Sequence, residues 1–255
     1  MEMVILIAAI LLAAGFIKGF SGFATSIILS GFLFFYYDPI LIVPVLALIS
    51  FCLNILILIE HAKYIKNLKS NFAFRPETLI LLIIGIFLGA KALLFFNPNI
   101  IKIVFALAVV LAVYLINHKI SEDDNSFKIP RWESNAIIGF ISGFFSGMIN
   151  VNGPPALIYG LYHKYNKIKL LKSVVVFYLI ADLITLIIFW LHGMYSVESI
   201  ILFLWFIPAA LIGFFIGMVV RVKTSNIRFK KYVIFLILMI AVKMFIESVY
   251  KLIYP

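Results

Sequence analysis

The chain has 255 residues, of which 65% are hydrophobic and only 13% are charged, and its mean hydropathy is +1.17. A soluble domain averages about 45–50% apolar and roughly 25% charged residues, so this composition excludes an ordinary water-soluble fold and predicts an all-α integral membrane protein. The net charge of +10 does not indicate nucleic-acid binding, because the Lys and Arg residues lie in short loops between apolar stretches.

Hydropathy divides the chain into eight apolar stretches. They are residues 3–36, 39–59, 77–96, 99–117, 135–162, 170–191, 197–220 and 232–250. Six of them have the length of one membrane-spanning helix, which needs about 20 residues. The N-terminus lacks the basic leader and small-residue cleavage site of a signal peptide, so residues 3–17 are expected to belong to the mature protein.

The first and fifth stretches do not fit one span, because helix-breaking residues occupy the middle of each. Residues 18–22 read KGFSG and residues 150–155 read NVNGPP, and Gly and paired Pro interrupt helices. Each arm then has roughly 12–15 residues, or about 18–22 Å at the helical rise, which passes mid-membrane without crossing comfortably. Each stretch is therefore either a re-entrant hairpin or one kinked span.

The loop charges favour the re-entrant alternative for the fifth stretch. Lys and Arg gather in the loops 60–76, 118–134, 163–172 and 221–231, which hold four, three, four and five of them. If all eight stretches crossed, these residues would divide almost evenly between the two sides, whereas a non-crossing fifth stretch places all of them on one side. The positive-inside rule makes that side cytoplasmic. We therefore expect a multi-pass protein of the cytoplasmic (inner) membrane, with both termini outside the cytoplasm.

The two halves of the chain resemble each other. GFIKGF at 15–20 matches GFISGF at 139–144 with an offset of 124 residues, and GIFLGA at 85–90 matches GFFIGM at 213–218 with an offset of 128. We expect the four extra residues at the second break. Three crossings invert the chain, so a hairpin plus three spans in each half predicts an inverted-topology repeat. The alternative is chance glycine spacing in apolar sequence.

The predicted organisation has two repeats and a linker. The first repeat is 1–117 (hairpin 3–36, spans 39–59, 77–96 and 99–117), the cytoplasmic linker is 118–134, and the second repeat is 135–255 (hairpin 135–162, spans 170–191, 197–220 and 232–250).

The two breaks predict a binding site for a small anion. Irregular backbone within lipid survives only where it is buried in protein or lines a polar cavity, and the second arm of each hairpin begins at the tip with free N–H groups that attract anions. Asn152 suits an N-cap followed by Pro in the first helical turn. The predicted substrate-binding residues are Lys18, Ser21, Gly22, Thr25, Ser146, Asn150, Asn152, Gly153 and Pro154. The alternative is that these residues only cap helices.

Two ionisable residues lie deep in apolar stretches, where a charge usually faces a cavity or a partner. Lys18 either supplies the counter-charge for the anion, snorkels, or forms an internal ion pair. Asp182 either carries a proton or pairs with Lys18, and Asn54 aligns with it at the offset of 128. Asn54 and Asp182 are therefore the coupling candidates, with protons or another coupling ion as expected partners beside the anion and the lipid bilayer. The sequence leaves the oligomeric state open.

Five segments, in chain order, resemble the TauE/SafE sulfite exporter family. They are GFIKGFSGFATS (15–26), LNILILIEHAKYIK (53–66), GIFLGA (85–90), GFISGFFSGMINVNGPPALIYG (139–160) and IPAALIGFFIGM (207–218). The family pattern has a glycine-rich break after a G-x-x-x-G helix in each half, and here SGFATS replaces the first glycine run. The resemblance implies an inner-membrane secondary carrier that moves sulfite, an organosulfonate or a related small anion outward, using ion gradients.

Two functions of other classes are alternatives. An intramembrane enzyme needs paired acids with a metal, an HExxH motif or a Ser–His pair within the membrane, but Asp182 stands alone and the four histidines lie at the ends of apolar stretches. The single cysteine, Cys52, excludes an internal disulfide and a cysteine-based metal site. We therefore predict a transporter with no catalytic residues, metal or cofactor. A non-transporting assembly factor would leave the polar breaks without a use.

Overall fold

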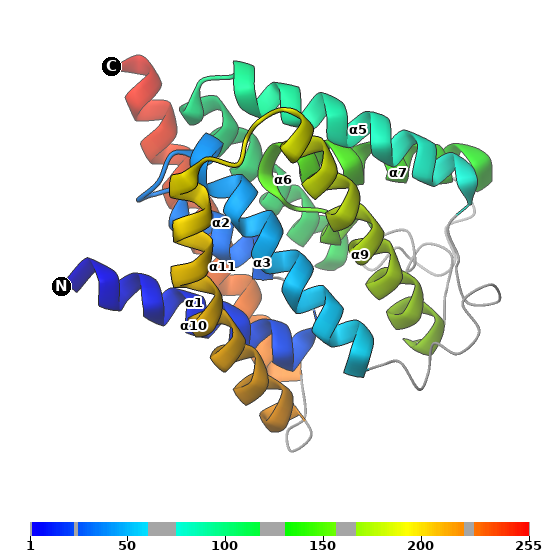
Figure 1. The fold of residues 1–255 in the computed structure, drawn as a ribbon, viewed down its shortest axis with the longest axis horizontal. Helices are drawn as coiled ribbons and strands as arrows, with labels where there is room; N and C mark the ends of the chain where they lie inside the picture. The colour runs from blue at the N-terminus through cyan, green and yellow to red at the C-terminus, as the bar shows by residue number, and fades with distance from the viewer. Residues whose placement is uncertain are drawn as a thin grey trace.

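The computed structural model describes residues 2–22, 25–60, 75–117, 131–156, 167–221 and 227–254, and all regular secondary structure in these ranges is helical (Figure 1). The helices are α1 (Glu2–Ser21), α2 (Thr25–Leu33), α3 (Pro39–Glu60), α5 (Pro76–Phe95), α6 (Pro98–Asn117), α7 (Arg131–Ile149), α9 (Lys167–Leu191), α10 (Val197–Arg221) and α11 (Ile227–Ile253). Among the described residues, five helices are long and apolar enough to cross a membrane. The chain is an all-α integral membrane protein.

The six predicted single spans correspond to α3, α5, α6, α9, α10 and α11, with ends that differ from prediction by a few residues. Polar side chains fix where several of these helices begin. Asp38 and Asn97 each accept a hydrogen bond from the backbone N–H two residues later, at 2.8 Å, and each is followed by Pro at the first helical position. Ser196 accepts from the N–H of Ser199 at 3.1 Å and starts α10 in the same way.

Both predicted helix breaks are present, but the arms before them are longer than predicted. Helix α1 has 20 residues and α7 has 19, whereas the expected length was 12–15, and α2 has only nine. The expected lengths were wrong because α1 continues through KGFS to Ser21, and because α7 begins at Arg131, four residues before the predicted stretch. The second break lies at residues 150–152, as predicted, and helix resumes at 153–156.

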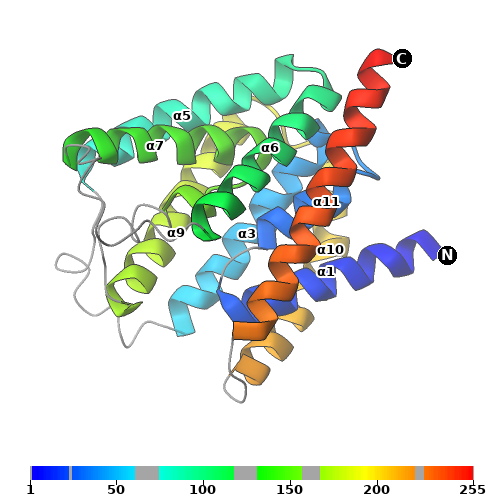
Figure 2. The same cartoon turned by 180° about the vertical axis from the view of Figure 1, so that it is seen from behind.

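The connections between helices separate toward two ends of the molecule. The short turns that follow α2, α5 and α9 lie at the upper end in Figure 1, as does the C-terminus. The last turns of α3 and α10 and the first turns of α9 and α11 lie at the lower end, and Figure 2 agrees. These lower ends adjoin the Lys/Arg-rich loops 60–76, 163–172 and 221–231, whereas the first turns of α5 and α7 lie at the right of Figure 1. The common side of the four loops and its cytoplasmic assignment stay predictions.

Two helix pairs have the closest packing, α1 with α10 and α5 with α7 (Figures 1 and 2). Glycines allow the helices of each pair to lie this close. A Cβ atom at Gly19 would overlap the carbonyl of Phe214, and one at Gly147 would overlap the carbonyl of Ile86. Helices in lipid associate through such small-residue faces, since burial of apolar surface gives no net gain there. The G-x-x-x-G spacing therefore brings together helices that are far apart in the sequence.

These glycine contacts follow one numerical rule. Each contact joins one residue of the first half to one residue of the second half. If 128 is added to the number of the first residue and subtracted from the number of the second, the result is another of these contacts. The matched contacts are Gly15–Ala210 with Gly143–Leu82, Gly19–Phe214 with Gly147–Ile86, Gly213–Leu12 with Gly85–Phe140, and Gly217–Phe16 with Gly89–Phe144.

The offset of 124 predicted for the first arm is wrong by one helical turn. Glycines spaced by four residues align with other glycines after a shift of one turn, so the sequence alone matches Gly15 equally well with Gly139 and with Gly143. The packing partners distinguish the two alignments, because only 128 also relates Ala210 to Leu82. The counterpart of Lys18 is therefore Ser146, and no extra residues are needed at the second break.

Candidate functional site

The two arms α1 and α7 end in the same backbone conformation. Gly22 has φ +80° and Asn150 has φ +55°, and both lie in the left-handed region that ends many helices. The N–H of Gly22 donates to the Lys18 carbonyl at 2.7 Å, and the N–H of Asn150 donates to the Ser146 carbonyl at 3.0 Å. Asn replaces Gly at the second end because Asn tolerates this conformation better than most residues.

The second break is held to two helices by a buried carboxylate on α9. Both oxygens of Asp182 accept hydrogen bonds, one from Nδ2 of Asn54 on α3 at 2.6 Å and one from Nδ2 of Asn152 at 2.9 Å. Asp182 is 1% exposed, and both amides are also buried. The two amide donors satisfy the ionised carboxylate, as a buried charge requires. The coupling candidates Asn54 and Asp182 are therefore in direct contact.

A second chain of polar groups joins the breaks through α3. The Asn150 amide donates to Oγ of Ser50 at 3.0 Å, and Ser50 is hydrogen-bonded to Ser26 of α2 at 3.0 Å. Ser30 of α2 donates to the Ile149 carbonyl at 3.1 Å. The Oδ1 atom of Asn150 is buried without a partner among the described groups. The second arm of the first hairpin thus lies against the end of α7.

Lys18 brings a positive charge from the last turn of α1 to this region. Its side chain is 4% exposed, and its Nζ lies 5.8 Å from the centre of the Tyr178 ring on α9. The Tyr178 hydroxyl donates to the Gly153 carbonyl at 3.0 Å, directly after the second break. Lys18 and Asp182 are close enough to interact electrostatically, but within the described ranges no ion pair of 4.0 Å or less joins them. The predicted internal pairing is therefore not a direct contact.

The remaining predicted residues divide between the site and the scaffold. Ser146 is buried and shares a 2.9 Å hydrogen bond with Thr185 of α9, and Pro154 is buried in the first turn after the break. Thr25 does not cap α2, since its hydroxyl contacts the Ala14 carbonyl at 3.5 Å. Ser21 is the last residue of α1, but its side chain lies outside the described part of the chain.

Four polar residues of the site were missed in the sequence: Ser26, Ser50, Tyr178 and Thr185. A helical spacing would have revealed three of them. Ser50 precedes Asn54 by four residues on α3, and Tyr178 and Thr185 stand four residues before and three after Asp182 on α9. Residues three or four apart share one helix face, so each coupling candidate marks a polar face directed at the breaks.

The electrostatics of the site rest on two opposite charges. Among the described residues, only Lys18 and Asp182 are both charged and buried. The N-terminal ends of α2 and of the helix at 153–156 lie at the two breaks and contribute positive partial charge. No group of three or more His, Cys, Asp or Glu side chains within the described ranges is placed to hold a metal ion. The arrangement is suited to holding a small polar ligand.

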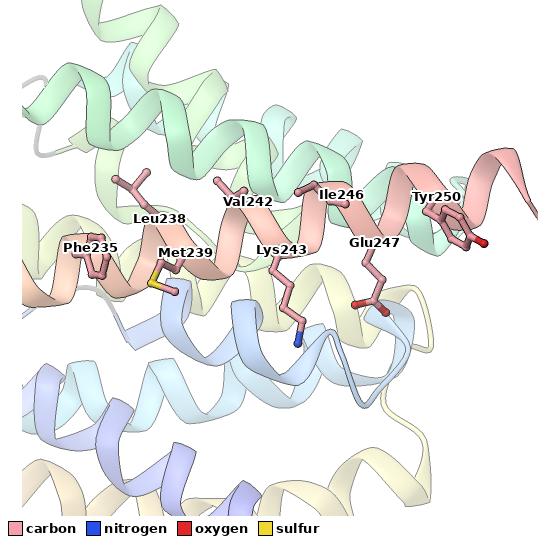
Figure 3. Close-up of a pocket in the computed structure, with 8 residues that line it drawn as sticks. All are labelled: Phe235, Leu238, Met239, Val242, Lys243, Ile246, Glu247 and Tyr250. Carbon is pink, nitrogen blue, oxygen red and sulfur yellow. The ribbon is translucent and has the colours of Figure 1, made fainter.

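A groove along α11 provides a contrast to this site (Figure 3). It is lined by Phe235, Leu238, Met239, Val242, Lys243, Ile246, Glu247 and Tyr250, most of which are exposed apolar side chains. Lys243 lies over the Phe35 ring at 4.9 Å, and Glu247 forms an ion pair with Lys251 at 2.7 Å. An exposed apolar helix face of this kind is what a lipid-facing surface requires.

Comparison with protein families gives one match that covers most of the chain. The sulfite exporter TauE/SafE family matches residues 6–244, which include all nine described helices at least in part. No curated protein and no solved structure matches the chain. The predicted resemblance is confirmed, and the chain belongs to the sulfite exporter TauE/SafE family of membrane transporters.

Proposed function

We propose that this protein is a secondary transporter that moves a small anion, such as sulfite or an organosulfonate, across the cytoplasmic membrane by alternating access. The anion binds where the two helix breaks meet. One observation carries this proposal: Lys18 is buried beside the second break, and no acid among the described residues is directly paired with it. Family membership supports transport of a sulfur-containing anion.

The unpaired charge of Lys18 favours an anionic ligand. A buried ammonium group is strongly destabilising unless it is paired and hydrogen-bonded. The Tyr178 ring supplies a cation–π contact with Lys18, but no negative charge. Both oxygens of Asp182 already accept hydrogen bonds from amides. A bound anion gives Lys18 the direct partner that the described part of the chain does not provide.

The backbone at the breaks supports the same ligand. Helix N-termini bind anions through free N–H groups and the positive end of the helix dipole. Residue 153 begins the helix after the second break, and as Gly it presents no side chain between a ligand and the backbone. Gly22 has no atom of the described residues within 4 Å of the position that a Cβ would occupy, whereas the corresponding position at Gly153 lies 3.1 Å from the Tyr178 hydroxyl. The backbone of the first break is therefore open to a small anion, and at the second break the Tyr178 hydroxyl lies beside the backbone.

We infer further that the two halves form an inverted repeat, with residues 1–117 and 135–255 joined by the linker 118–134. The support is the set of glycine contacts that interconvert at the offset of 128, together with the two left-handed helix ends at Gly22 and Asn150, which differ by the same number. In such repeats the substrate lies near mid-membrane, and an exchange of conformation between the halves alternates access. The coupled motion would transfer the anion between the two faces.

Proteoliposomes test this function directly. Purified protein should take up labelled sulfite or methanesulfonate in exchange for the same anion trapped inside, and protein-free liposomes should not. Lys18→Met should abolish most of the exchange, whereas Lys91→Met, which removes an exposed lysine on α5, should leave it intact. Absence of flux for every small sulfur-containing or carboxylate anion, with or without a proton gradient, would reject the proposal.

A further inference from the structure

Asn54 and Asp182 are counterparts of each other at the offset of 128, and they are also in contact. Their hydrogen bond of 2.6 Å joins α3 of the first half to α9 of the second. Shifting Asn54 forward by 128 residues gives Asp182, and shifting Asp182 back gives Asn54, so the offset converts this contact into itself. The offset converts each glycine contact into a different pair of residues. The pair therefore lies where the two halves meet symmetrically, and both conformations of an alternating transporter would share it.

The two members of the pair are unequal in chemistry. Asp182 can bind and release a proton, whereas Asn54 cannot, although the two side chains have nearly the same shape. Asn152 contributes the second amide, and its counterpart in the first half of the sequence is Ala24, which has no polar side chain. Of the symmetric pair, only Asp182 can titrate, and its second hydrogen bond joins it to Asn152 of the second break.

We propose that Asp182 carries one proton with each transported anion in the same direction, so that the protein is a proton–anion symporter in which an inward proton gradient favours uptake of the anion and an outward gradient of the anion itself drives its export. This inference rests on the proposed transport function and names its coupling ion. In the proton-bound state, one Asp182 oxygen is a hydroxyl donor and the charge of the side chain is zero. Release of the proton to water on the opposite face restores the carboxylate, so protons and charge balance over the cycle.

Electrostatic repulsion provides the coupling. The charged and titratable groups that face Asp182 are Lys18 from α1 and Tyr178 on α9, while α3 and the second break present the amides of Asn54 and Asn152. With Lys18 cationic and Asp182 anionic, the site is neutral, and an incoming anion leaves a net negative charge buried. A proton on Asp182 removes that excess. Binding of the anion and of the proton are therefore mutually favourable, which is the thermodynamic condition for symport.

Protonation also changes the hydrogen bonding at the break. The ionised carboxylate accepts from two amide N–H groups, but a protonated one has to donate from one of its oxygens. One of the two amides then turns to present its Oδ1 atom or moves away from Asp182. Because Asn152 lies in the break itself, gain of a proton can alter the position of the residues that bind the anion. The carboxylate is thereby connected to the ligand site as well as to the symmetric junction.

The test compares proton and anion fluxes in proteoliposomes with a pH dye trapped inside. The wild-type protein should move about one additional proton per sulfite and should accumulate sulfite in response to an imposed pH gradient. Asp182→Asn, which mimics the neutral side chain, should lower the gradient-driven accumulation at least about tenfold when it is expressed relative to the variant's own rate of anion exchange. Comparison of the same anion in both proteins cancels any proton that sulfite itself carries. Glu247→Gln, an exposed acid on α11, is the matched control.

A double variant, Asn54→Asp with Asp182→Asn, provides a second readout if the single variant does not fold. It keeps one carboxylate and one amide at the junction and exchanges their positions, so it should recover proton-driven accumulation. Unchanged proton coupling in Asp182→Asn, or a folded double variant that exchanges anions without proton coupling, would overturn the inference and leave the transport function standing. Loss of all anion flux in the wild-type protein would instead reject the transport function, and this inference with it.

Discussion

The two helix breaks have the same backbone and different side chains. Gly22 and Asn150 both end an arm with a positive φ and with a hydrogen bond back to the residue four positions earlier. At the first break, α1 carries the cation Lys18. The counterpart of Lys18 on α7 is the neutral Ser146. The second break instead brings amides, through Asn150 and Asn152.

This difference indicates how a repeated scaffold acquires an asymmetric site. In the proposed repeat, each half has a helix that ends inside the membrane, so the same helix end with satisfied polar groups is required twice. The proposed ligand is bound only once, so a cation from one half and amides from the other suffice. A lysine at both breaks would instead bury two cations with one carboxylate, Asp182, to compensate them, which is unfavourable in a buried environment.

The largest expected effect tests how alike the two halves are. Gly19→Ala and Gly147→Ala each place a Cβ against a backbone carbonyl, so both should destabilise the fold by about 3 kcal/mol, at the upper end of overpacking effects. Gly31→Ala is the comparison, because its Cβ would meet side-chain atoms, a methyl group of Ile240 at 2.9 Å and the Phe105 ring at 3.5 Å, and no backbone carbonyl. Thermal unfolding in detergent measures the three. A large effect at one of the counterpart glycines and none at the other would contradict the common offset.

The next effect separates the charged break from the amide break. Lys18→Met should lower anion exchange roughly tenfold to hundredfold, because a hydrogen bond to a charged group contributes about 1.5–3 kcal/mol. Asn150→Ala should lower exchange less, since Asn150 brings no charge. Rates of labelled sulfite exchange, normalised to the amount of reconstituted protein, make the comparison. Equal losses of exchange in the two variants would show that the charge at the first break contributes no more to transport than the amide at the second.

A smaller effect concerns the helix end itself. Asn150→Gly reproduces the residue of the first break, so it should lose only the hydrogen bond to Ser50, a loss of about 1 kcal/mol. Asn150→Ala loses the same bond and also strains a left-handed residue, which adds about 1 kcal/mol. Denaturation midpoints should therefore rank wild type, then Gly, then Ala. If Asn150→Gly were less stable than Asn150→Ala, backbone strain would be excluded as a reason for the lower stability of Asn150→Ala.

The smallest effect lies at the lower ends of α3 and α10, where Arg221 forms an ion pair with Glu60. The counterpart positions are Leu93 and Ile188, which are apolar, so this pair has no equivalent at the other end. Because both charged side chains are partly exposed, Arg221→Gln should change stability by less than about 1 kcal/mol. A thermal shift larger than that of Asn150→Gly would indicate that the ion pair is coupled to the rest of the fold.

Local features of the sequence predicted most of the helices and both breaks. Asp38 and Asn97 before Pro, and NVNGPP at the second break, act within a few residues, so their effect is readable without knowledge of the fold. The arm lengths were mispredicted because KGFS continues the helix of α1 up to Gly22. The repeat alignment was mispredicted because glycines spaced by four residues are unchanged by a shift of one turn.

The sequence by itself determined that the chain is a bundle of membrane helices with two interruptions, since apolar length and helix-breaking residues are local properties that the bilayer acts on directly. Only the tertiary structure decided that Asn54, Asn152 and Asp182 meet, that Lys18 lies by Tyr178 without a direct acid partner, and that the halves correspond at 128. These contacts join residues up to 201 positions apart, as in Gly217 with Phe16, and their formation depends on which helix faces pack together. Hydropathy does not encode that choice, because in lipid every apolar face is equally soluble and small residues and hydrogen bonds select the partners.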